Sequence, residues 1–242
     1  MRPIGFSTGA IAFGDFRGAL ATLRKHANLG CVELSALRVP EVLPLIEALP
    51  SLDLKMYSYV SFHAPSQFSQ EDEAWLADLL HENVPSAWPI ILHPDTIHDF
   101  SHWARFEQRV AIENMDRRKK CGRGIHELTH IFSKLPDARL CFDIGHSHQF
   151  DPSMTDAFQI LTLLGSRIAQ LHLSEVDSES HHEPVSYGTM LAFNRVSYLI
   201  PEWVPVILES RVNESQIETE VAAADQSLPV GDGNAESLPR PA

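Results

Sequence analysis

Apolar residues in this chain gather in eight short runs, and most runs are nearly continuous instead of alternating with polar residues. Continuous apolar runs of this length predict strands that are covered on both faces, as in a parallel sheet. The predicted strands span residues 4–7, 31–35, 55–62, 90–93, 109–113, 140–143, 168–173 and 204–209.

Helical periodicity fills most of the segments between these runs. Apolar residues recur three or four positions apart in residues 16–29, 70–83, 125–135, 155–165, 189–199 and 214–224. Strands that alternate with helices predict a (β/α)8 TIM barrel in a single domain, an α/β fold. A doubly wound sheet is the alternative, but no GxGxxG turn follows the first strand. We expect the barrel in residues 1–226 and a disordered tail in residues 227–242, where Gly, Pro and Ser gather without periodicity.

Six imidazole or carboxylate side chains each end one of the apolar runs. They are His63 in YVSFHAP, His93 in PIILHPD, Glu113 in VAIENMD, Asp143 in LCFDIGH, His172 in IAQLHLS and Glu209 in VILESR. Pro65, Pro94 and Gly145 follow closely, which places the ligand-type residues late in their strands. Because the carboxyl ends of barrel strands share one face, we expect all six side chains to converge on one site.

Each of these residues has a plainer interpretation when it is taken alone. A single histidine in an apolar run is more often a hydrogen-bonded core residue, and a single strand-end carboxylate more often caps the next helix. A buried polar group is costly without a partner, so six at equivalent strand ends favour a shared site. Mixed imidazole and carboxylate ligands are typical of Zn, Mn, Fe or Co, and we predict one to three divalent ions. Such ions polarise a sugar carbonyl or hydroxyl, or activate water for hydrolysis.

Four further features lie close to these strand ends in the sequence. His146 follows Asp143 by three residues, so we expect it in a loop that turns back toward the cavity. The long acidic segment 174–188 is either a solvated surface loop, or a lid or metal-binding arm that uses His182 or His181. Glu33 ends the second run and either lines the cavity or has a capping or core role. Arg211 either clamps a substrate phosphate or carboxylate, or forms a structural ion pair.

The composition of the chain indicates which classes of partner it is suited to bind. The 19 basic and 32 acidic residues give a formal charge of −13, which disfavours duplex DNA because phosphate backbones bind Lys and Arg. The basic run 117–120 is the counter-signal, either as a solvated loop or as a contact for a small phosphorylated substrate. Three cysteines without CxxC spacing indicate neither a disulfide framework nor a Cys-type zinc module. Cys31 and Cys141 lie in apolar runs, so we expect them to be buried thiols. No span approaches the length of a membrane helix, so we expect a cytoplasmic protein without membrane contact; the sequence leaves its oligomeric state open.

The segments SFHAPS, LHPD, IENMD, FDIGH and LHLSEVD resemble the xylose isomerase-like TIM-barrel superfamily, and the resemblance covers nearly all of residues 1–225. Glu113, Asp143, His172 and Glu209 are similar to the one-metal quartet of ketose 3-epimerases, which implies that Glu113 and Glu209 also move protons. The endonuclease IV pattern implies three zinc ions instead. His63, His93 and Glu113 would hold the first, the quartet the second, and His146 and His182 the third. That pattern has an Asp where this chain has Ser180, so the third ion would need Glu179, His181 or Glu183 as a substitute.

These observations predict a divalent-metal-dependent isomerase or epimerase that acts on a small sugar or sugar phosphate. An endonuclease IV-like hydrolase of phosphate esters is the alternative, favoured by His63, His93 and the DIGH segment. A non-catalytic barrel that binds a metal or ligand is the third hypothesis, and it has no direct support because the ligand set is complete.

Overall fold

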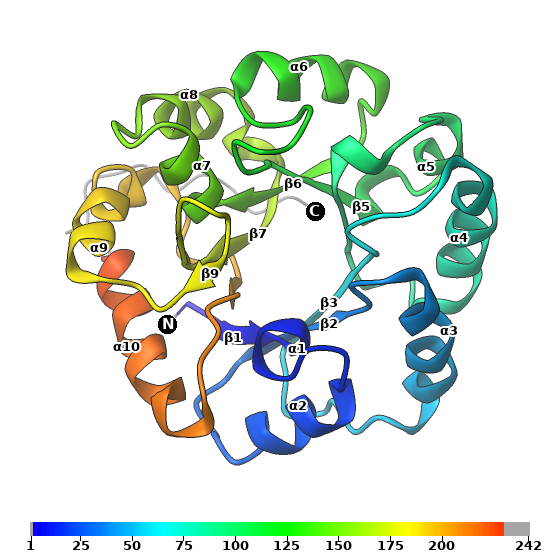
Figure 1. Ribbon diagram of the computed structural model, residues 1–242, viewed down its shortest axis with the longest axis horizontal. Helices are drawn as coiled ribbons and strands as arrows, with labels where there is room; N and C mark the ends of the chain where they lie inside the picture. The colour runs from blue at the N-terminus through cyan, green and yellow to red at the C-terminus, as the bar shows by residue number, and fades with distance from the viewer. Residues whose placement is uncertain (1, 230–242) are drawn as a thin grey trace.

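Eight parallel strands close into a barrel in the computed structural model, which describes residues 2–229 (Figure 1). The order around the barrel is β1-β10-β7-β6-β5-β4-β3-β2, so every strand except the closing pair neighbours the strands before and after it in the chain. The strands are β1 (Ile4–Ser7), β2 (Cys31–Ser35), β3 (Tyr59–His63), β4 (Ile90–Leu92), β5 (Val110–Glu113), β6 (Arg139–Asp143), β7 (Ile168–Leu173) and β10 (Val206–Leu208). The predicted (β/α)8 barrel is confirmed.

Helices form a ring around the strands (Figure 1). They are α1 (Thr8–Ile11), α2 (Phe16–Leu23), α3 (Val39–Ala48), α4 (Gln70–Asn83), α5 (Ser101–Ala104), α6 (Ile125–Lys134), α7 (Ile144–Phe150), α8 (Thr155–Leu164), α9 (Tyr187–Asn194) and α10 (Ile217–Ser227). The outer faces of the strands and the inner faces of these helices share one large apolar core, to which Phe6, Phe62 and Trp103 contribute fully buried side chains. Burial on both faces explains why the strands appear as continuous apolar runs.

Several element boundaries differ from the sequence prediction. Helix α3 was not predicted, because Pro40 stands in its first turn and Pro44 inside it, and proline normally ends a helical pattern. Strand β3 begins at Tyr59 instead of residue 55, and α2 ends at Leu23 instead of residue 29. These shifts do not move the strand ends that carry the candidate site, because each barrel strand ends within one residue of the end of its apolar run.

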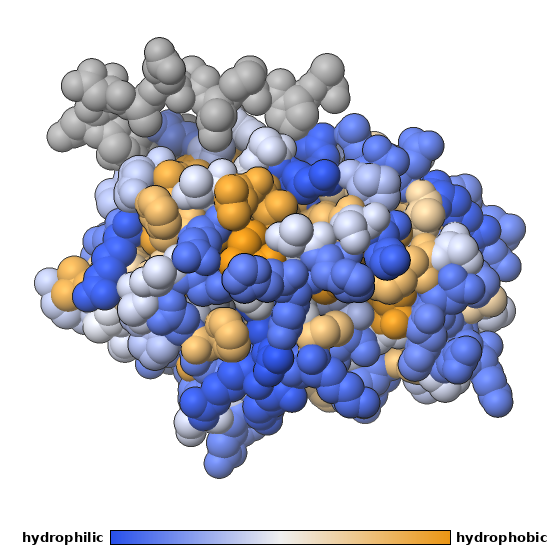
Figure 2. All heavy atoms as spheres, turned by 90° about the horizontal axis from the view of Figure 1, so that it is seen from above, coloured by the Kyte–Doolittle hydropathy of each residue, from blue (hydrophilic) through white to orange (hydrophobic). Residues whose placement is uncertain are grey.

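Near the C-terminus, α10 ends at Ser227 and Leu228 is buried. Residues 230–242 of the predicted tail lie outside the described residues. Cys31 and Cys141 are buried free thiols, as predicted. None of the helices within residues 2–229 combines the length and apolarity that a membrane crossing requires. On the flank shown in Figure 2, apolar residues form separate patches among hydrophilic ones.

Candidate metal centre

The carboxyl ends of the barrel strands bring the six predicted residues together. His63, Glu113 and Asp143 are the last residues of β3, β5 and β6, and His172 is the penultimate residue of β7. His93 and Glu209 directly follow β4 and β10. Five of the six are buried, and the side chain of Glu209 is 14% exposed. The structure therefore places a dense cluster of ionisable groups at one end of the barrel interior.

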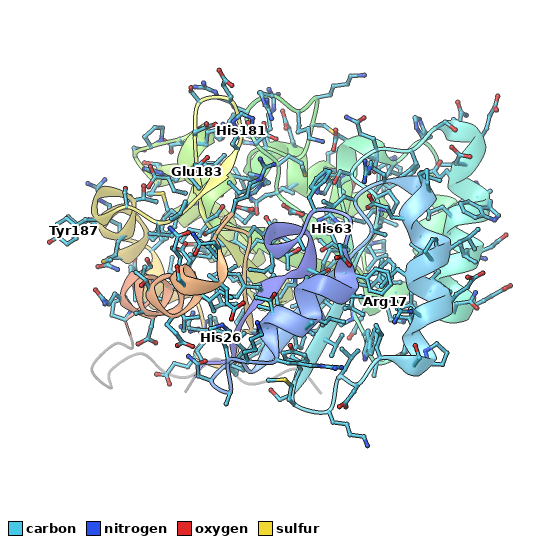
Figure 3. All side chains as sticks on the ribbon, turned by 60° about the horizontal axis from the view of Figure 1, so that its bottom comes forward. Arg17, His26, His63, His181, Glu183 and Tyr187 are labelled. Carbon is cyan, nitrogen blue, oxygen red and sulfur yellow. The ribbon has the colours of Figure 1, made fainter. Side chains whose placement is uncertain are left out.

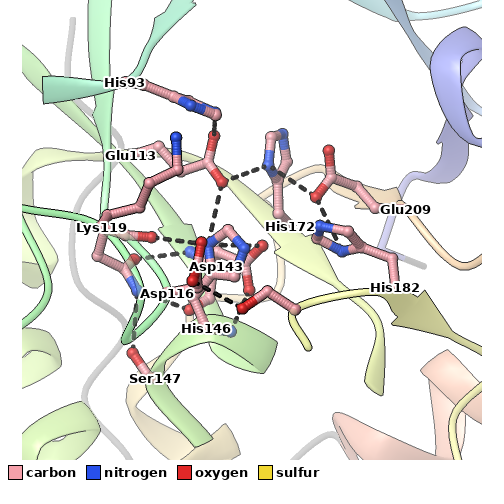
Figure 4. Close-up of polar contacts among 12 residues, drawn as sticks. His93, Glu113, Asp116, Lys119, Asp143, His146, Ser147, His172, His182 and Glu209 are labelled. Atoms are coloured by element: carbon pink, nitrogen blue, oxygen red, sulfur yellow. Dashed lines mark hydrogen bonds and ion pairs between the residues drawn. The ribbon is translucent and has the colours of Figure 1, made fainter. Parts of the chain in front are cut away.

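Glu113 lies at the centre of this cluster (Figure 4). Its Oε2 atom is 3.3 Å from His63 Nε2 and 3.2 Å from His93 Nε2. Its Oε1 atom is 3.3 Å from His146 Nδ1 and 3.5 Å from His172 Nδ1. One carboxylate thus faces four imidazoles, with two on each oxygen, which is an arrangement that a carboxylate bridging two cations would also have.

Asp143 serves the fold and the site at once. Its Oδ1 atom accepts a hydrogen bond of 2.7 Å from the backbone N–H of His146 and so caps α7. Its Oδ2 atom is buried, has no hydrogen-bond partner among the described residues, and lies 3.3 Å from His146 Nδ1. The capping and shared-site interpretations of this strand-end carboxylate are therefore compatible.

His146 stands in the first turn of α7 and not in a loop, which corrects the sequence prediction. The helix begins directly after β6 because Asp143 caps it. Gly145 allows this close approach, since a Cβ atom there would collide with the backbone oxygen of Ser174. The Nδ1–H of His146 donates to the backbone oxygen of Asn114 at 2.9 Å, which holds the ring toward the cluster.

The segment 174–188 contains a short antiparallel hairpin of β8 (Glu175–Val176) and β9 (His182–Glu183). The hairpin carries His182 to the cluster, where its Nδ1 atom is 3.5 Å from Glu209 Oε2 and 2.8 Å from Ser174 Oγ. His181 instead pairs with Asp177 at the surface. Glu183 pairs with Glu175 at the base of the hairpin, and both His181 and Glu183 lie apart from His63 (Figure 3).

Ser180 departs from the endonuclease IV pattern, and the structure shows which carboxylate is next to it. Its hydroxyl donates to Asp116 Oδ1 at 2.7 Å, and Asp116 is buried. Glu179 is 77% exposed and Glu183 is exposed, so neither reaches the position of the missing acid. The residue next to Ser180 is therefore Asp116, which the sequence analysis did not select.

Glu33 and Arg211 lie on opposite sides of the cluster. Glu33 is fully buried, does not line the cavity, and accepts hydrogen bonds from Ser61 and Gln170. Arg211 is exposed and lines the cavity, and its backbone N–H donates to the carbonyl of His182 at 3.3 Å. Among residues 2–229, Arg211 forms no ion pair with a carboxylate.

The donor geometry fits divalent ions. Among the five groups of described residues whose potential ligand atoms lie within 4.8 Å of one another, three consist only of predicted metal ligands. They are His63, His93 and Glu113; then Glu113, Asp143, His172 and Glu209; then Asp143, His146 and His182. Asp143 Oδ2 and His172 Nδ1 are buried donor or acceptor atoms without a hydrogen-bond partner among the described residues. Buried polar atoms are normally paired, so these two orphans point to a ligand that the site is built to hold.

The pKa values of the clustered imidazoles also indicate that the carboxylates of the site favour a nearby positive charge. Burial disfavours charge on His63 and His146. Nevertheless, Glu113 and Glu33 raise the pKa of His63 to about 9, and Asp143 and Glu113 raise the pKa of His146 to about 10. Burial and the charge of His146 lower the pKa of His182 to about 3. Because clustered carboxylates recruit protons onto these imidazoles, bound cations would take over that role.

The two glutamates of the quartet differ in their pKa. Burial and the charge of Glu113 raise the pKa of Glu209 to about 8, although the charge of His172 opposes the shift. The pKa of Glu113 lies well below its ordinary value because the charges of His172 and His93 outweigh the effect of burial. One carboxyl group of the pair is thus easily protonated while the other stays ionised.

An open cavity of about 590 Å³ leads to the cluster. Its walls include the basic residues Arg38, Arg118, Lys119 and Arg211, and the exposed aromatic ring of Phe13. The basic run predicted at 117–120 therefore contributes two residues to the cavity wall, where Lys119 pairs with Asp95 at 3.2 Å. A cavity of this volume suits a small molecule.

Two supporting residues were missed in the sequence. Asn114 accepts from the backbone N–H of Asp143 at 2.7 Å and donates to its carbonyl at 2.7 Å, which clamps the end of β6. Gln170 packs under His172 and donates to Glu33 at 2.7 Å. The only available signal was their position next to or two residues before a predicted ligand.

The model of the xylose isomerase-like TIM barrel family matches residues 100–228. Among solved structures, a 3-keto-D-glucoside 4-epimerase from E. coli is similar with a TM-score of 0.58 at 12% identity, covering 92% of this chain and 98% of that one. An AP endonuclease of family 2 from Brucella melitensis has a TM-score of 0.52 at 13% identity, covering 92% and 99%.

A protein from Anabaena variabilis that is provisionally described as a sugar phosphate isomerase/epimerase has a TM-score of 0.53 at 12% identity, covering 98% of this chain and 92% of that one. Among curated proteins, none matches the sequence. At these identities the structural likeness shows the fold and not the reaction.

Proposed function

We propose a function on the premise that this chain belongs to the xylose isomerase-like TIM barrel family. The chain is a divalent-metal-dependent isomerase or epimerase of a sugar or sugar phosphate. The observation that carries this proposal is the quartet of Glu113, Asp143, His172 and Glu209, whose ligand atoms lie within 4.8 Å of one another at the base of a small-molecule cavity.

The quartet would hold one ion, with the orphaned Asp143 Oδ2 and His172 Nδ1 atoms among its ligands. A Zn, Mn, Fe or Co ion supplies a Lewis acid that binds and polarises neighbouring substrate oxygens. The chain supplies the rigid frame, because all four residues stand at or next to strand ends of a closed barrel and Asp143 is fixed by its helix cap.

Proton transfer at carbon is the part of the reaction that we assign to Glu113 and Glu209. Glu113 Oε1 and Glu209 Oε2 each lie 3.5 Å from His172 Nδ1, so the two carboxylates approach the same point from different strands. The ionised one removes a proton from the carbon next to the substrate carbonyl, and the protonated one returns a proton to carbon in the resulting enediolate. Paired groups with separated pKa values are suited to this division of labour.

The volume and the lining of the cavity favour a sugar as the substrate over duplex DNA. Its volume of about 590 Å³ accommodates a monosaccharide. Phe13 is 62% exposed at its rim and offers an apolar ring on which the C–H face of a sugar packs, while Arg38 lies over the same ring at 5.1 Å. Arg211 and Lys119 would contact an anionic substituent such as a phosphate.

The test is exchange of solvent deuterium into ketoses and their phosphates, screened with each of the four metals. Wild-type protein is expected to label the carbon next to the carbonyl of its substrate. Glu113→Gln and Glu209→Gln should each lower the exchange rate about 10²- to 10⁴-fold, because each removes one proton-transfer group. Leu163→Gln, on the exposed side of α8, is the matched control and should keep the wild-type rate. Exchange that persists in both Glu variants would contradict the assigned roles.

A second candidate is a hydrolase of phosphate esters, and one observation favours it. Beyond the quartet, His63 with His93 and His146 with His182 complete two further three-ligand groups, as a three-ion site requires. Hydrolysis of bis(4-nitrophenyl) phosphate by zinc-loaded protein, with loss of the activity in His63→Ala, would support this candidate. Hydrolysis that is absent while deuterium exchange is present would leave the isomerase or epimerase as the function.

A further inference from the structure

Glu33 lies under the candidate metal centre and contacts one of its ligands from below. Its Oε2 atom is 3.1 Å from His172 Nε2, and it also accepts hydrogen bonds from Ser61 Oγ at 3.1 Å and Gln170 Nε2 at 2.7 Å. Glu33 and these three partners are all fully buried. We propose that Glu33 is a positioning residue that holds the proton of His172 on Nε2, so that Nδ1 is free to bind the metal ion. This inference rests on the metal dependence of the proposed function.

The two nitrogens of His172 face different surroundings. Nε2 points to Glu33, whereas Nδ1 points to Glu113 and Glu209, at 3.5 Å from each, and has no hydrogen-bond partner among the described residues. A neutral imidazole carries its single proton on one nitrogen and binds a cation through the other. A cation on Nδ1 therefore requires the proton on Nε2, and the carboxylate of Glu33 is the acceptor that stands there.

Gln170 offers a contact that would favour the other tautomer of His172, in which the proton is on Nδ1. Its Nε2 atom lies 2.8 Å from His172 Nε2, and its Oε1 atom accepts a hydrogen bond of 2.7 Å from Tyr59, which fixes the orientation of the amide. If the amide donated to the ring, the proton of His172 would sit on Nδ1 and exclude a cation. The carboxylate of Glu33 opposes this arrangement because an ionised acceptor binds an N–H more strongly than a neutral one does.

Because Glu33 stands on a barrel strand, its carboxylate is held at a fixed position relative to the ring of His172. Glu33 stands on β2 and His172 on β7, and these residues are 139 positions apart in the chain. Tyr59, Gln170 and Glu33 form a continuous hydrogen-bonded chain under the ligand. Partners of this kind, which orient a metal-binding histidine from behind, typically contribute about 10- to 100-fold in metal affinity.

The experiment uses the full chain loaded with zinc and labelled with ¹⁵N-histidine. Two-dimensional NMR of the imidazole nitrogens is expected to show His172 with a proton on Nε2 and a zinc-shifted Nδ1; His172→Asn identifies the signal. Titration with a competing zinc chelator should show that Glu33→Gln and Glu33→Ala bind zinc about 10- to 100-fold more weakly with unchanged stoichiometry. Cys31→Ala, two residues earlier on β2, should keep the wild-type affinity.

Three results would overturn the proposal while leaving the proposed function intact. They are a proton on Nδ1 of His172 in the zinc-loaded wild type, an unchanged affinity in both Glu33 variants, and the loss of one zinc ion per chain in Glu33→Gln. The last result would make Glu33 itself a ligand, since one of its oxygens lies within 4.8 Å of ligand atoms of His63 and Glu209. Wild-type protein that holds no zinc, manganese, iron or cobalt would contradict the proposed function together with this inference. The NMR measurement on wild type keeps the test decisive even if a Glu33 variant does not fold.

Discussion

Two layers of the same barrel interior, one pleat apart, have opposite chemistry. In the layer toward the amino ends of the strands, Ile91, Ala111, Cys141 and Ala169 form a small apolar cluster. In the layer at the carboxyl ends, the next inward positions of β5 and β6 are Glu113 and Asp143. Since both layers are buried, burial alone does not decide the chemistry; the polar layer exists because each of its residues has partners from other strands.

The two ends of the barrel also differ in the cavities that open there. A cavity of about 830 Å³ lies at the amino ends of the strands, lined by residues such as Trp88, Arg109 and Trp203. It is the larger of the two cavities, yet the clusters of potential metal ligands lie at the other end. The potential metal ligands of this barrel therefore lie where the strands end and not at the larger cavity, in agreement with the location of active sites in other TIM barrels.

The largest expected effect distinguishes the polar layer by its response to metal. Saturating metal should raise the free energy of unfolding of wild type by about 4 kcal/mol when free metal is a thousand times its dissociation constant. Asp143→Asn should lose most of this gain, because it keeps an oxygen to cap α7 but removes the charge from the site. Urea unfolding with and without chelator measures both. An equal metal gain in Asp143→Asn would separate Asp143 from the site.

The apolar layer should respond to truncation and not to metal. Ile91→Ala is expected to lower the free energy of unfolding by about 2–5 kcal/mol, because Ile91 is fully buried and its loss leaves a cavity. The metal-dependent gain should stay at the wild-type value in the same variant. Ile91→Val, with a smaller cavity, should cost about 0.5–1.5 kcal/mol. A metal gain that disappears with either substitution would show that the two layers are not independent.

The pH dependence of stability should also separate metal-free from metal-loaded protein. His63 and His146 have pKa values of about 9 and about 10, above the ordinary 6.5, so their stabilising contribution is complete below pH 6.5 and is lost as pH rises through these values. The pKa of Glu209, raised to about 8 from 4.5, acts in the same direction between those values. We therefore expect metal-free protein to become less stable from pH 6.5 to pH 10.

His182 works in the opposite sense, since its pKa is lowered to about 3 and its contribution is lost as pH falls below 6.5. Metal-loaded protein should lose less stability above pH 6.5, because bound ions replace the protons on the ligands. Urea unfolding of both forms at pH 6.5 and 9.5 measures the difference. Parallel pH profiles for the two forms would mean that metal and protons do not compete for the same residues.

The smallest effect concerns the rim of the cavity. Arg211→Gln should raise the KM for a phosphorylated substrate about tenfold, or about 1.4 kcal/mol, and leave kcat nearly unchanged, because it removes a contact to the anionic substituent. Arg105→Gln, at the opposite end of the barrel, is the matched control and should change neither constant. Steady-state kinetics with phosphorylated and unphosphorylated forms of the substrate tests this. An equal rise in KM for the neutral sugar would contradict an anion-binding role.

Much of the site could be predicted from the sequence because strand ends converge. His63, His93, Glu113, Asp143, His172 and Glu209 each follow an apolar run, and barrel closure turns that one-dimensional regularity into proximity. His182 was proposed from its place in the long acidic segment 174–188 and from the family resemblance, whereas the hairpin that carries it to the site was not predicted.

The remainder depends on contacts between distant side chains, which leave no periodic signal. Gln170 meets Glu33 across 137 residues, and Ser180 meets Asp116 across 64. The predicted position of His146 in a loop was wrong for a local reason, since Asp143 serves as an N-cap and a helix begins directly after the strand. A strand-end carboxylate fits both the pattern of a helix cap and that of a metal ligand, and the sequence does not show that both can apply to one residue.

The most direct test of the central claim is the metal content of the full chain, purified without chelator or immobilised nickel and measured by plasma mass spectrometry. We expect at least one bound Zn, Mn, Fe or Co per chain, retained on dialysis and lost in Asp143→Asn. About one ion per chain would favour the isomerase or epimerase, and two or three zinc ions the hydrolase. Protein that contains none of these metals and binds none when they are added back would contradict the metal centre.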